Sequence, residues 1–407
     1  MRVLYLCHRI PYPPDKGDKI RAFHQIRALA SRHEVDVFTL ADDAGDLVHQ
    51  AGLASYCHSL KVARIYPKLA RLKALPYLLT RTALTIPCFH SAELKKEIRK
   101  ALLQRSYDRI FIYSSAMAQY LDWDDAPQVI TDLVDVDSDK WRQYAAFVTF
   151  PYSAIYRREA RALREYEREV CRRSSAIVVT TEREARLVRE IWSASRVQVV
   201  PNGVDSDHFS PAASIDNASP AIALVGDMSY FPNVEAAIFF TSKVFPLIRS
   251  KLSDARFLIV GRNPTPSVLK LQRINGVEVT GRVPDVRPWL ARAQVSVAPF
   301  SISAGIPNKI LEAMACGLPV VATPCGVQGL SADVRGAVET AEGAEKFALR
   351  VVDLLNNPAL ARRKGLEGRA RVMAVHNWDQ SLELLLDLLE NPKGQALTQA
   401  SVHCSPA

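Results

Sequence analysis

The 407-residue chain lacks the features that mark several large protein classes. No apolar run approaches the roughly 18 residues of a membrane-spanning helix. The short apolar stretch at the N-terminus ends at His8 and Arg9, before three prolines, so we interpret it as a first strand and not as a signal peptide. The seven cysteines are odd in number and form no CxxC pair. This argues against a disulfide framework or a structural zinc site and predicts a cytoplasmic protein.

Sequence motifs of several enzyme classes are absent as well. No GxGxxG follows the first predicted strand and no GxxxxGK[ST] occurs, which disfavours a dinucleotide-dependent dehydrogenase or a P-loop enzyme. The absence of HExxH and GxSxG removes the commonest hydrolase signatures.

The composition is that of an ordinary globular protein, with 48% hydrophobic and 23% charged residues. The length predicts two domains. Residues 1–200 hold 32 Lys and Arg against 24 Asp and Glu, whereas residues 201–407 hold 20 against 19. A basic first half suggests an anionic partner there, either phosphates, acidic glycans or a membrane surface, although solubility alone explains the charge equally well.

Short β-branched runs alternate with helical patterns, which predicts an α/β protein with parallel sheets. We expect strands within 2–7, 35–40, 109–114, 128–134, 176–181, 221–226, 256–261, 277–281, 295–300 and 319–324. The turn-forming residues of "VVPNGVDSDHFSP" indicate a domain boundary. We therefore expect a first domain over 1–200, a linker over 201–211, a second domain over 212–375, a helix over 376–391 that packs back on the first domain, and a disordered tail over 392–407.

Two basic stretches of the first half allow more than one interpretation. The arginines between Trp141 and Arg173 could suggest nucleic acid, but glutamates interleaved at i,i+4 spacing favour a solvent-exposed helix and no nucleic-acid partner. Residues 61–81 mix Lys and Arg with Leu, Ile and Tyr, as a helix on an anionic membrane does. Two prolines interrupt them, so an ordinary surface helix is favoured.

Candidate ligand sites follow the predicted strands. Gly226, Gly261 and Gly281 end three strands of the second domain, where a ligand of a parallel sheet would approach the backbone. In the first domain, Gly17 and a cap by Asp18 would start a helix. Lys16, Lys19 and Arg21 would surround that helix start and either bind an anion or form a solvated basic face.

Two acidic features add to these candidates. Asp135, Asp137 and Asp139 alternate after a strand, so they could share one side and contact a sugar, or simply end the strand. We favour sugar or acceptor contacts over a metal, because no further oxygen ligands adjoin them. Glu312 falls opposite the apolar arc of a helix in "NKILEAMACG" and would point into water or a cleft.

Together these motifs resemble those of the family 4 glycosyltransferases, which have the GT-B architecture of two facing Rossmann-like domains. The chain is most similar to the sugar transferases associated with exosortase-linked exopolysaccharide clusters. The blocks that carry the resemblance are "PPDKGDKIRAFH", "DVDSDKWRQYA", "PNGVD", "GDMSYFPNVEAAIFF", "VGRNP", "VTGRVPDVRPWLARAQVSVAPF" and "NKILEAMACGLPVVAT".

The resemblance implies transfer of a sugar from a nucleotide-sugar donor to a glycan or lipid-linked acceptor, with retention of configuration and without a metal or other cofactor. It implies an enzyme of exopolysaccharide biosynthesis that reacts in an interdomain cleft. We expect it in the cytoplasm, where the charge of its basic first domain would allow contact with the inner face of the membrane. The alternatives are a nucleotide-sugar epimerase, a sugar-binding protein, or a degenerate transferase that acts as a partner subunit.

The resemblance also implies roles for individual residues. Glu312 matches the glutamate that binds the donor ribose, and Gly17 matches the loop that closes over the diphosphate. The implied donor site comprises Gly17, Gly226, Arg262, Arg282, Val283, Gly305, Ile306, Asn308, Lys309 and Glu312. The implied acceptor site comprises Lys16, Lys19, Asp137 and Lys140, with Asp135 as a candidate catalytic residue.

The sequence departs from the family pattern at three points. Ala304 stands where the family has the first of two glutamates. The usual Arg and Lys are missing from "VGDMSYFPNVE", and Arg262 is a candidate substitute. The usual histidine near residues 128–137 is also missing, and Asp135 lies in that region.

Overall fold

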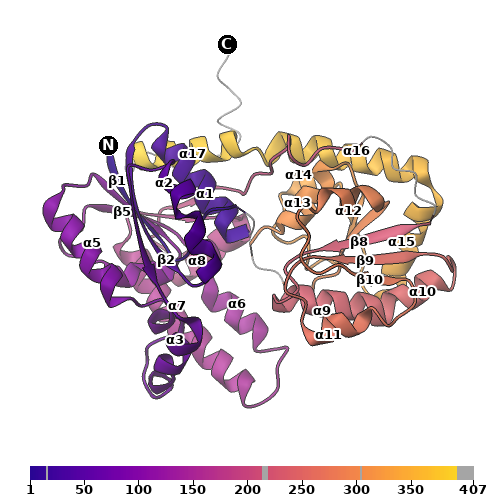
Figure 1. Cartoon of the computed structure of the whole chain (residues 1–407), viewed down its shortest axis with the longest axis horizontal. Coiled ribbons are helices and arrows are strands. Elements are labelled where there is room, and N and C mark those ends of the chain that lie inside the picture. The colour runs from indigo at the N-terminus through magenta and orange to yellow at the C-terminus, as the bar shows by residue number, and fades with distance from the viewer. Residues whose placement is uncertain (15–16, 213–218, 303–304, 392–407) are drawn as a thin grey trace, which may run out of the picture. The chain divides into compact units, whose positions relative to one another are not determined.

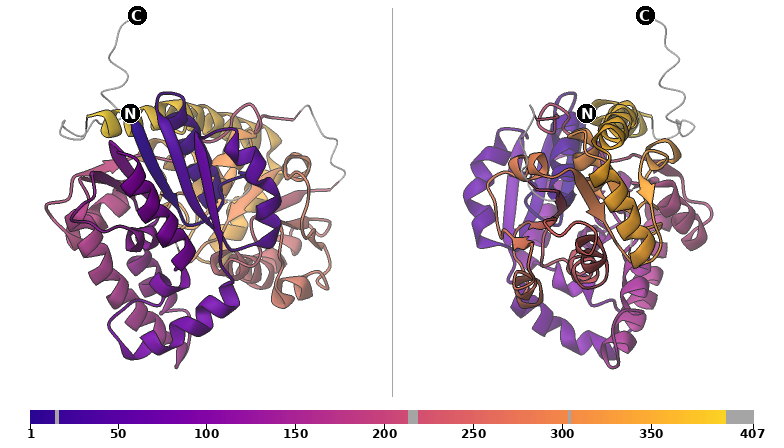
Figure 2. Two further views of the ribbon diagram at one scale, coloured as in Figure 1. Left: turned by 60° about the vertical axis from the view of Figure 1, so that its left-hand side comes forward. Right: turned by 90° about the vertical axis from the view of Figure 1, so that its right-hand side faces the viewer.

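The computed structural model describes residues 1–14, 17–212, 219–302 and 305–391. The chain forms two compact units, one made of residues 1–201 with the segment from Asp379 onward, and one made of residues 202–378. Each unit is built on its own parallel sheet, with helices along the sheet faces (Figures 1 and 2).

Unit 1 contains a seven-stranded sheet in the order β3-β2-β1-β4-β5-β6-β7. Its strands are β1 Arg2–Cys7, β2 Glu34–Ala41, β3 Ser59–Arg64, β4 Arg109–Tyr113, β5 Gln128–Asp132, β6 Ala176–Val179 and β7 Val197–Val199. Its helices are α1 Gly17–Ala30, η1 Ala44–His49, α2 Gln50–Ala54, α3 Pro67–Ala74, η2 Leu75–Leu79, α4 Thr85–Cys88, α5 Ala92–Gln104, η3 Ser115–Tyr120, α6 Asp137–Tyr144, α7 Tyr152–Arg173, α8 Glu182–Ile191 and α17 Trp378–Glu390.

Unit 2 contains a six-stranded sheet in the order β10-β9-β8-β11-β12-β13. Its strands are β8 Ala221–Val225, β9 Arg256–Val260, β10 Val277–Val279, β11 Val295–Ala298, β12 Val320–Ala322 and β13 Glu339–Thr340. Its helices are α9 Phe231–Phe239, the π-helical turn η4 Phe240–Val244, α10 Phe245–Arg249, α11 Pro266–Leu271, α12 Arg287–Arg292, α13 Asn308–Ala315, α14 Ala332–Arg335, α15 Ala344–Asn356 and α16 Pro358–Val375.

In both sheets the order of the strands reverses beside the first strand of the unit. β1 pairs with β2 on one side and β4 on the other, and β8 likewise lies between β9 and β11. Loops leave in opposite directions at such a position, which opens a crevice at the carboxyl ends of the strands. The expected α/β class with parallel sheets is confirmed, and each predicted strand range contains a strand.

Two local predictions were wrong in part. Residues 61–64, which we assigned to a surface helix, belong to the edge strand β3, because residues Ser59–Arg64 pair in parallel with Asp36–Ala41 of β2. The charged helix within 141–173 exists as α7, but it is not solvent-exposed throughout. Glu159 and Glu167 are 2% and 0% exposed because each accepts backbone hydrogen bonds from a neighbouring segment.

No helix among the described residues is long and apolar enough to cross a membrane. The helix α17 packs within unit 1, where Arg32 pairs with Glu383 at 2.6 Å and Arg109 donates to the carbonyl oxygen of Leu389 at 3.0 Å.

Candidate functional site

The ends of β8 and β9 in unit 2 meet through two glycines. A Cβ atom on Gly261, whose φ is +151°, would lie 1.7 Å from the carbonyl oxygen of Gly226. A Cβ atom on Gly226 would lie 2.7 Å from Asn233 Nδ2 and 2.9 Å from Lys309 Nζ. Only glycine fits at position 261, where the clash is with backbone, whereas a side chain at position 226 would displace Asn233 and Lys309. The two strand ends and the Lys309 ammonium therefore occupy one crowded corner of the unit.

Lys309 lies in the first turn of α13. Its Nζ donates to Asn233 Oδ1 at 3.0 Å, and Asn233 Nδ2 donates to the carbonyl oxygen of Asp227 at 2.8 Å. Burial lowers the pKa of Lys309 to about 8, although Glu312 and Asp227 oppose this shift. An ammonium at the start of a helix, where backbone N–H groups point outward, suits an anionic ligand.

Glu312 lies one turn beyond Lys309 on the same helix. It is half-buried between the buried Leu311 and Ala313. Burial raises the pKa of Glu312 to about 7 against the lowering effect of Lys309. The carboxylate and the ammonium therefore titrate within a narrow range around neutral pH.

Arg262, the expected substitute for the missing basic residues, forms an ion pair with Asp227, with its Nε 3.1 Å from Asp227 Oδ2. Burial of Asp227 opposes ionisation, but hydrogen bonds from Ser229 and Arg262 outweigh it and lower the pKa of Asp227. Asp227 thus links Arg262, through its side chain, to Asn233 and Lys309, through its backbone.

The start of α13 is fixed from two sides. Gly305 has φ +62°, and a Cβ atom on Gly329 would lie 2.0 Å from the Gly305 carbonyl oxygen. Asn308 Oδ1 accepts a hydrogen bond from Asn202 Nδ2 at 3.1 Å. The side chain of Ile306 is 9% exposed and belongs to the core, which leaves its backbone for ligand contacts. Ala304 lies outside the described residues.

The remaining predicted donor residues follow β10 or begin α1. Arg282 is exposed, and Val283 packs against the cluster that contains Leu258 and Val260. Gly17 is exposed at the start of α1 in unit 1.

Basic side chains of the predicted anion site around α1 have acidic partners in the structure. Lys19 is 6% exposed and its Nζ lies 2.7 Å from Asp46. Arg21 is 1% exposed and pairs with the fully buried Asp132 at 2.8 Å. Asp18 is the second residue of α1 and pairs with Arg9 at 2.8 Å instead of occupying the N-cap. Lys16 lies outside the described residues.

The three aspartates after β5 do not share one side, because Asp137 already begins α6. Asp135 and Asp137 approach Lys140 at 3.4 and 2.5 Å. Asp139 instead pairs with Arg183 at 2.5 Å. The turn before Asp135 contains Val134 at φ +65°, a conformation that β-branched residues rarely adopt. Strain of this kind is concentrated at ligand and active sites.

Two buried glutamates near these aspartates had no counterpart in the sequence prediction. Glu184 accepts from Thr180 Oγ1 at 2.6 Å, and Glu167 accepts from the Ser138 N–H at 3.0 Å. Burial and the charge of Asp135 raise the pKa of Glu184, and burial raises the pKa of Glu167 to about 8. The T-x-x-E spacing of Thr181 and Glu184, typical of a capping box, was the available signal.

Two family models match the chain in succession. The model described as "Glycosyl transferase 4-like domain" matches residues 19–203, and the model described as "Glycosyl transferases group 1" matches residues 219–357. Together they cover about four fifths of the chain. Each half of the chain therefore matches a glycosyltransferase domain model. The matches therefore favour a glycosyltransferase over an epimerase or a binding protein.

The chain has curated relatives of modest identity. A GDP-mannose-dependent monoacylated alpha-(1-6)-phosphatidylinositol monomannoside mannosyltransferase of Corynebacterium glutamicum is 27% identical over 215 residues, which cover 47% of this chain and 55% of the relative. The chain spans about half the length of the curated relatives it matches.

Solved structures resemble the chain over nearly its whole length. Sucrose-phosphate synthase from Thermosynechococcus elongatus has a TM-score of 0.72 and 18% identity, and covers 96% of this chain and 99% of its own. Anabaena HepE in complex with UDP and glucose has a TM-score of 0.66 and 13% identity, and covers 96% and 100%. At these identities the likeness shows the fold, which is that of the GT-B glycosyltransferases.

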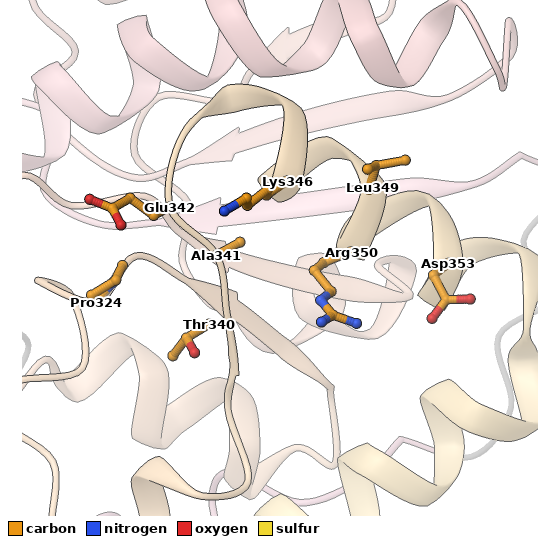
Figure 3. Close-up of a pocket in the computed structure, with 8 residues that line it drawn as sticks. All are labelled: Pro324, Thr340, Ala341, Glu342, Lys346, Leu349, Arg350 and Asp353. Carbon is orange, nitrogen blue, oxygen red and sulfur yellow. The ribbon is translucent and has the colours of Figure 1, made fainter.

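Two hollows in unit 2 are lined by residues other than Lys309 and Glu312. One, of about 580 Å³, is lined by Thr340, Glu342, Lys346, Arg350 and neighbouring residues (Figure 3). The other, of about 850 Å³, is lined by residues that include Arg287, Cys316 and Arg362. The candidate site is described by its side-chain contacts at the strand ends. Within the described ranges, no group of three or more His, Cys, Asp or Glu side chains could hold a metal ion.

Proposed function

We propose that this protein transfers a sugar from a nucleotide-sugar donor to a hydroxyl of a glycan or lipid-linked acceptor. In this proposal the configuration at the anomeric carbon is retained and the product enters exopolysaccharide biosynthesis in the cytoplasm. The observation that carries the proposal is the position of Lys309. Its ammonium stands at the start of α13, beside two glycine-ended strands and one turn before a carboxylate.

The proposed role of Lys309 follows from the charge of the leaving group. Cleavage of the bond between the sugar and the diphosphate leaves additional negative charge on the phosphate oxygens. The Lys309 ammonium and the N–H groups of the first turn of α13 would stabilise that charge without a metal ion. Arg262 would support it from the next strand end, at the cost of its ion pair with Asp227. The departing phosphate would take the proton of the acceptor hydroxyl, so no protein base is required.

Glu312 would bind the donor ribose. An ionised carboxylate accepts hydrogen bonds from two vicinal hydroxyls, and Glu312 is half-buried one turn from Lys309. Gly226, Gly305, Ile306 and Asn308 would contribute backbone contacts, and Arg282 with Val283 would border the base.

The acceptor would bind in unit 1 at the end of β5. Asp135, Asp137 and Lys140 form a small charged group there that suits sugar hydroxyls. Asp135 follows the strained Val134 and remains the candidate for direct contact with the reacting hydroxyl. Lys19 is less suited than predicted because Asp46 already neutralises it. A lipid-linked acceptor would be reached at the membrane, through contact by the basic unit 1.

The names of the relatives suggest which donors to test first. HepE was solved with UDP and glucose, and the Corynebacterium relative is named as GDP-mannose-dependent. We expect UDP or GDP to raise the melting temperature, with ADP and CMP as comparisons. A ligand at about one hundred times its Kd adds roughly 2.7 kcal/mol of stability. If none of the four nucleotides shifts the melt, the proposal is wrong.

Variants then locate the nucleotide. Glu312→Ala and Lys309→Met should both reduce the shift, whereas Glu345→Ala, on the first turn of α15, should not. A full shift in Glu312→Ala would remove that residue from the site. Incubation of the matching nucleotide-sugar with acceptors, followed by NMR of the product, tests transfer and retention, and addition of EDTA tests metal independence. An inverted product or an EDTA-sensitive rate would contradict those parts of the proposal.

A further inference from the structure

Unit 1 carries a stretch of chain whose charge and exposure differ from those of the rest of the molecule. Residues 59–92 contain no Asp or Glu but six Lys and Arg. All six side chains are exposed, and within the described part of the chain none lies within ion-pair distance of a carboxylate. These residues are Lys61, Arg64, Lys68, Arg71, Lys73 and Arg81. By contrast, Arg168, Arg172 and Arg173 on α7 pair with Glu165 or Glu169.

Large apolar side chains are exposed in the same stretch. Leu69, Leu72 and Leu75 are 46%, 62% and 52% exposed and follow one another at i,i+3 spacing, which places them along one face of α3 and the start of η2. Leu79, at the end of η2, is 95% exposed. Soluble proteins rarely leave such side chains together in water, and a group of them marks an interaction surface.

A second exposed apolar segment lies at the start of α7. Phe150 and Tyr152 are 80% and 60% exposed. Arg158, about 9 Å further along the helix at 1.5 Å per residue, donates to the carbonyl oxygens of Tyr77, Thr80 and Thr82 at 2.6 to 2.8 Å. In Figures 1 and 2, α3 and the connection from α6 to α7 lie at the same end of unit 1.

The junction between the two segments is built into the unit. Glu159, 2% exposed, accepts hydrogen bonds from the backbone N–H groups of Leu84 and Thr85 and from the Thr85 hydroxyl, at 2.7 to 2.9 Å. Ala83 and Leu163 pack in one buried cluster. The segments that carry the exposed apolar side chains are therefore held in place by hydrogen bonds and packing within unit 1.

We propose that residues 66–79 and 147–152, together called the α3–α7 surface, bind an anionic lipid membrane. Exposed leucines and aromatics flanked by unpaired lysines and arginines match the interfacial region of such a bilayer, where apolar groups enter the acyl boundary and cations meet the headgroups. A protein partner with an apolar face alone would leave the cations without a counterpart. The inference rests on the proposed function in that a lipid-linked acceptor would be reached at this surface.

The test uses the full chain and does not require transferase activity. We expect the protein to float with vesicles of phosphatidylcholine and phosphatidylglycerol, to bind vesicles of phosphatidylcholine alone much more weakly, and to lose binding in high salt. Leu72→Ser with Phe150→Ser should weaken binding by roughly tenfold or more for each apolar side chain. Lys68→Glu with Arg71→Glu should weaken it by at least fivefold for each charge.

Matched controls separate the surface from general effects. Leu103→Ser, at a position on α5 that is 80% exposed, and Lys270→Glu with Arg273→Glu, on unit 2, should leave vesicle binding unchanged. Unchanged melting temperatures would show that the variants fold. Equal binding by wild type and the surface variants, or no binding to anionic vesicles, would overturn the proposal. So would concentration-dependent self-association that Leu72→Ser abolishes in the absence of vesicle binding. A missing nucleotide shift would contradict the proposed function and leave the vesicle result standing.

Discussion

The hydrogen bond between Asn233 and Lys309 offers a direct test of the candidate site. Asn233 is 2% exposed, and its side chain accepts from Lys309 Nζ while it donates to the Asp227 carbonyl oxygen. Replacement by alanine removes a hydrogen bond to a charged group, worth about 1.5–3 kcal/mol, and a neutral one, worth about 1 kcal/mol. Lys309 is half-buried, so water replaces part of the first bond.

We therefore expect Asn233→Ala to lower the free energy of unfolding of unit 2 by about 2–3 kcal/mol. For a unit of this size each 1 kcal/mol shifts the melting temperature by roughly 2–4 °C, so the transition should fall by about 4–12 °C. The variant should also weaken nucleotide binding, because the ammonium is no longer held at the start of α13. Ser242→Ala, an exposed position just after α9, should change the unfolding free energy by less than about 0.5 kcal/mol.

A double-mutant cycle with Lys309→Met isolates the interaction. Calorimetric melting of wild type, the two single variants and the double variant should give a coupling energy of at least about 1 kcal/mol between the two side chains. A coupling below about 0.5 kcal/mol would refute the reasoning, since it would mean that Asn233 does not hold Lys309 in solution.

Three further predictions concern pH and packing. Nucleotide affinity, measured by calorimetry, should be highest between about pH 7 and pH 8, because Glu312 must be ionised and Lys309 protonated. Glu312→Gln should remove only the loss of affinity on the acid side of this optimum. An unchanged loss of affinity at acid pH would contradict the role of Glu312 in nucleotide binding. Burial raises the pKa of Glu167 to about 8 from its unfolded value of 4.5, so its contribution to stability is complete below pH 4.5 and is lost as the pH rises through 8. Glu167→Gln should flatten the dependence of the unfolding free energy on pH over this range, by several kcal/mol at about 1.36 kcal/mol per pKa unit. An unaltered pH profile in this variant would count against the raised pKa. Gly226→Ala should cost about 1–3 kcal/mol by overpacking against Asn233 and Lys309 and should weaken nucleotide binding. Gly45→Ala, where the added carbon meets only the Asp43 side chain, at 3.4 Å or more, should be nearly neutral in both the melting and the binding assay.

The sequence predicted the parts of the fold that depend on local patterns. Buried parallel strands are continuous β-branched runs, and the glycines after β8 and β9 are visible because a close backbone approach demands that residue. The strand β3 was missed because an edge strand contacts the sheet on one side only, so Lys61 and Arg64 remain exposed and the run does not look buried.

Local sequence patterns did not predict which side chains pair with partners far away in the sequence. Lys19 looked like a ligand because its partner Asp46 lies 27 residues away, and Arg21 pairs with Asp132 across 111 residues. Asn233 gave no signal at all, since a single asparagine near a helix start is common and its function depends on Lys309, 76 residues later. The sequence thus predicts the local fold, whereas the partner of each charged side chain depends on tertiary contacts.

The glycines of unit 2 also determine where this site could be redesigned. An added Cβ atom would meet backbone at Gly261 and the Asn233 and Lys309 side chains at Gly226, so substitution at either position disturbs the Lys309 corner. Gly281, with φ +67° and no atom within 4 Å of an added carbon, adjoins the exposed Arg282. A library built at residues 281 and 282 would therefore sample new side chains without displacing the Lys309 corner, provided that position 281 keeps a residue that tolerates a positive φ, such as asparagine. Ligand preference can therefore be varied in the loop after β10, whereas the glycines that end β8 and β9 leave no room for variation.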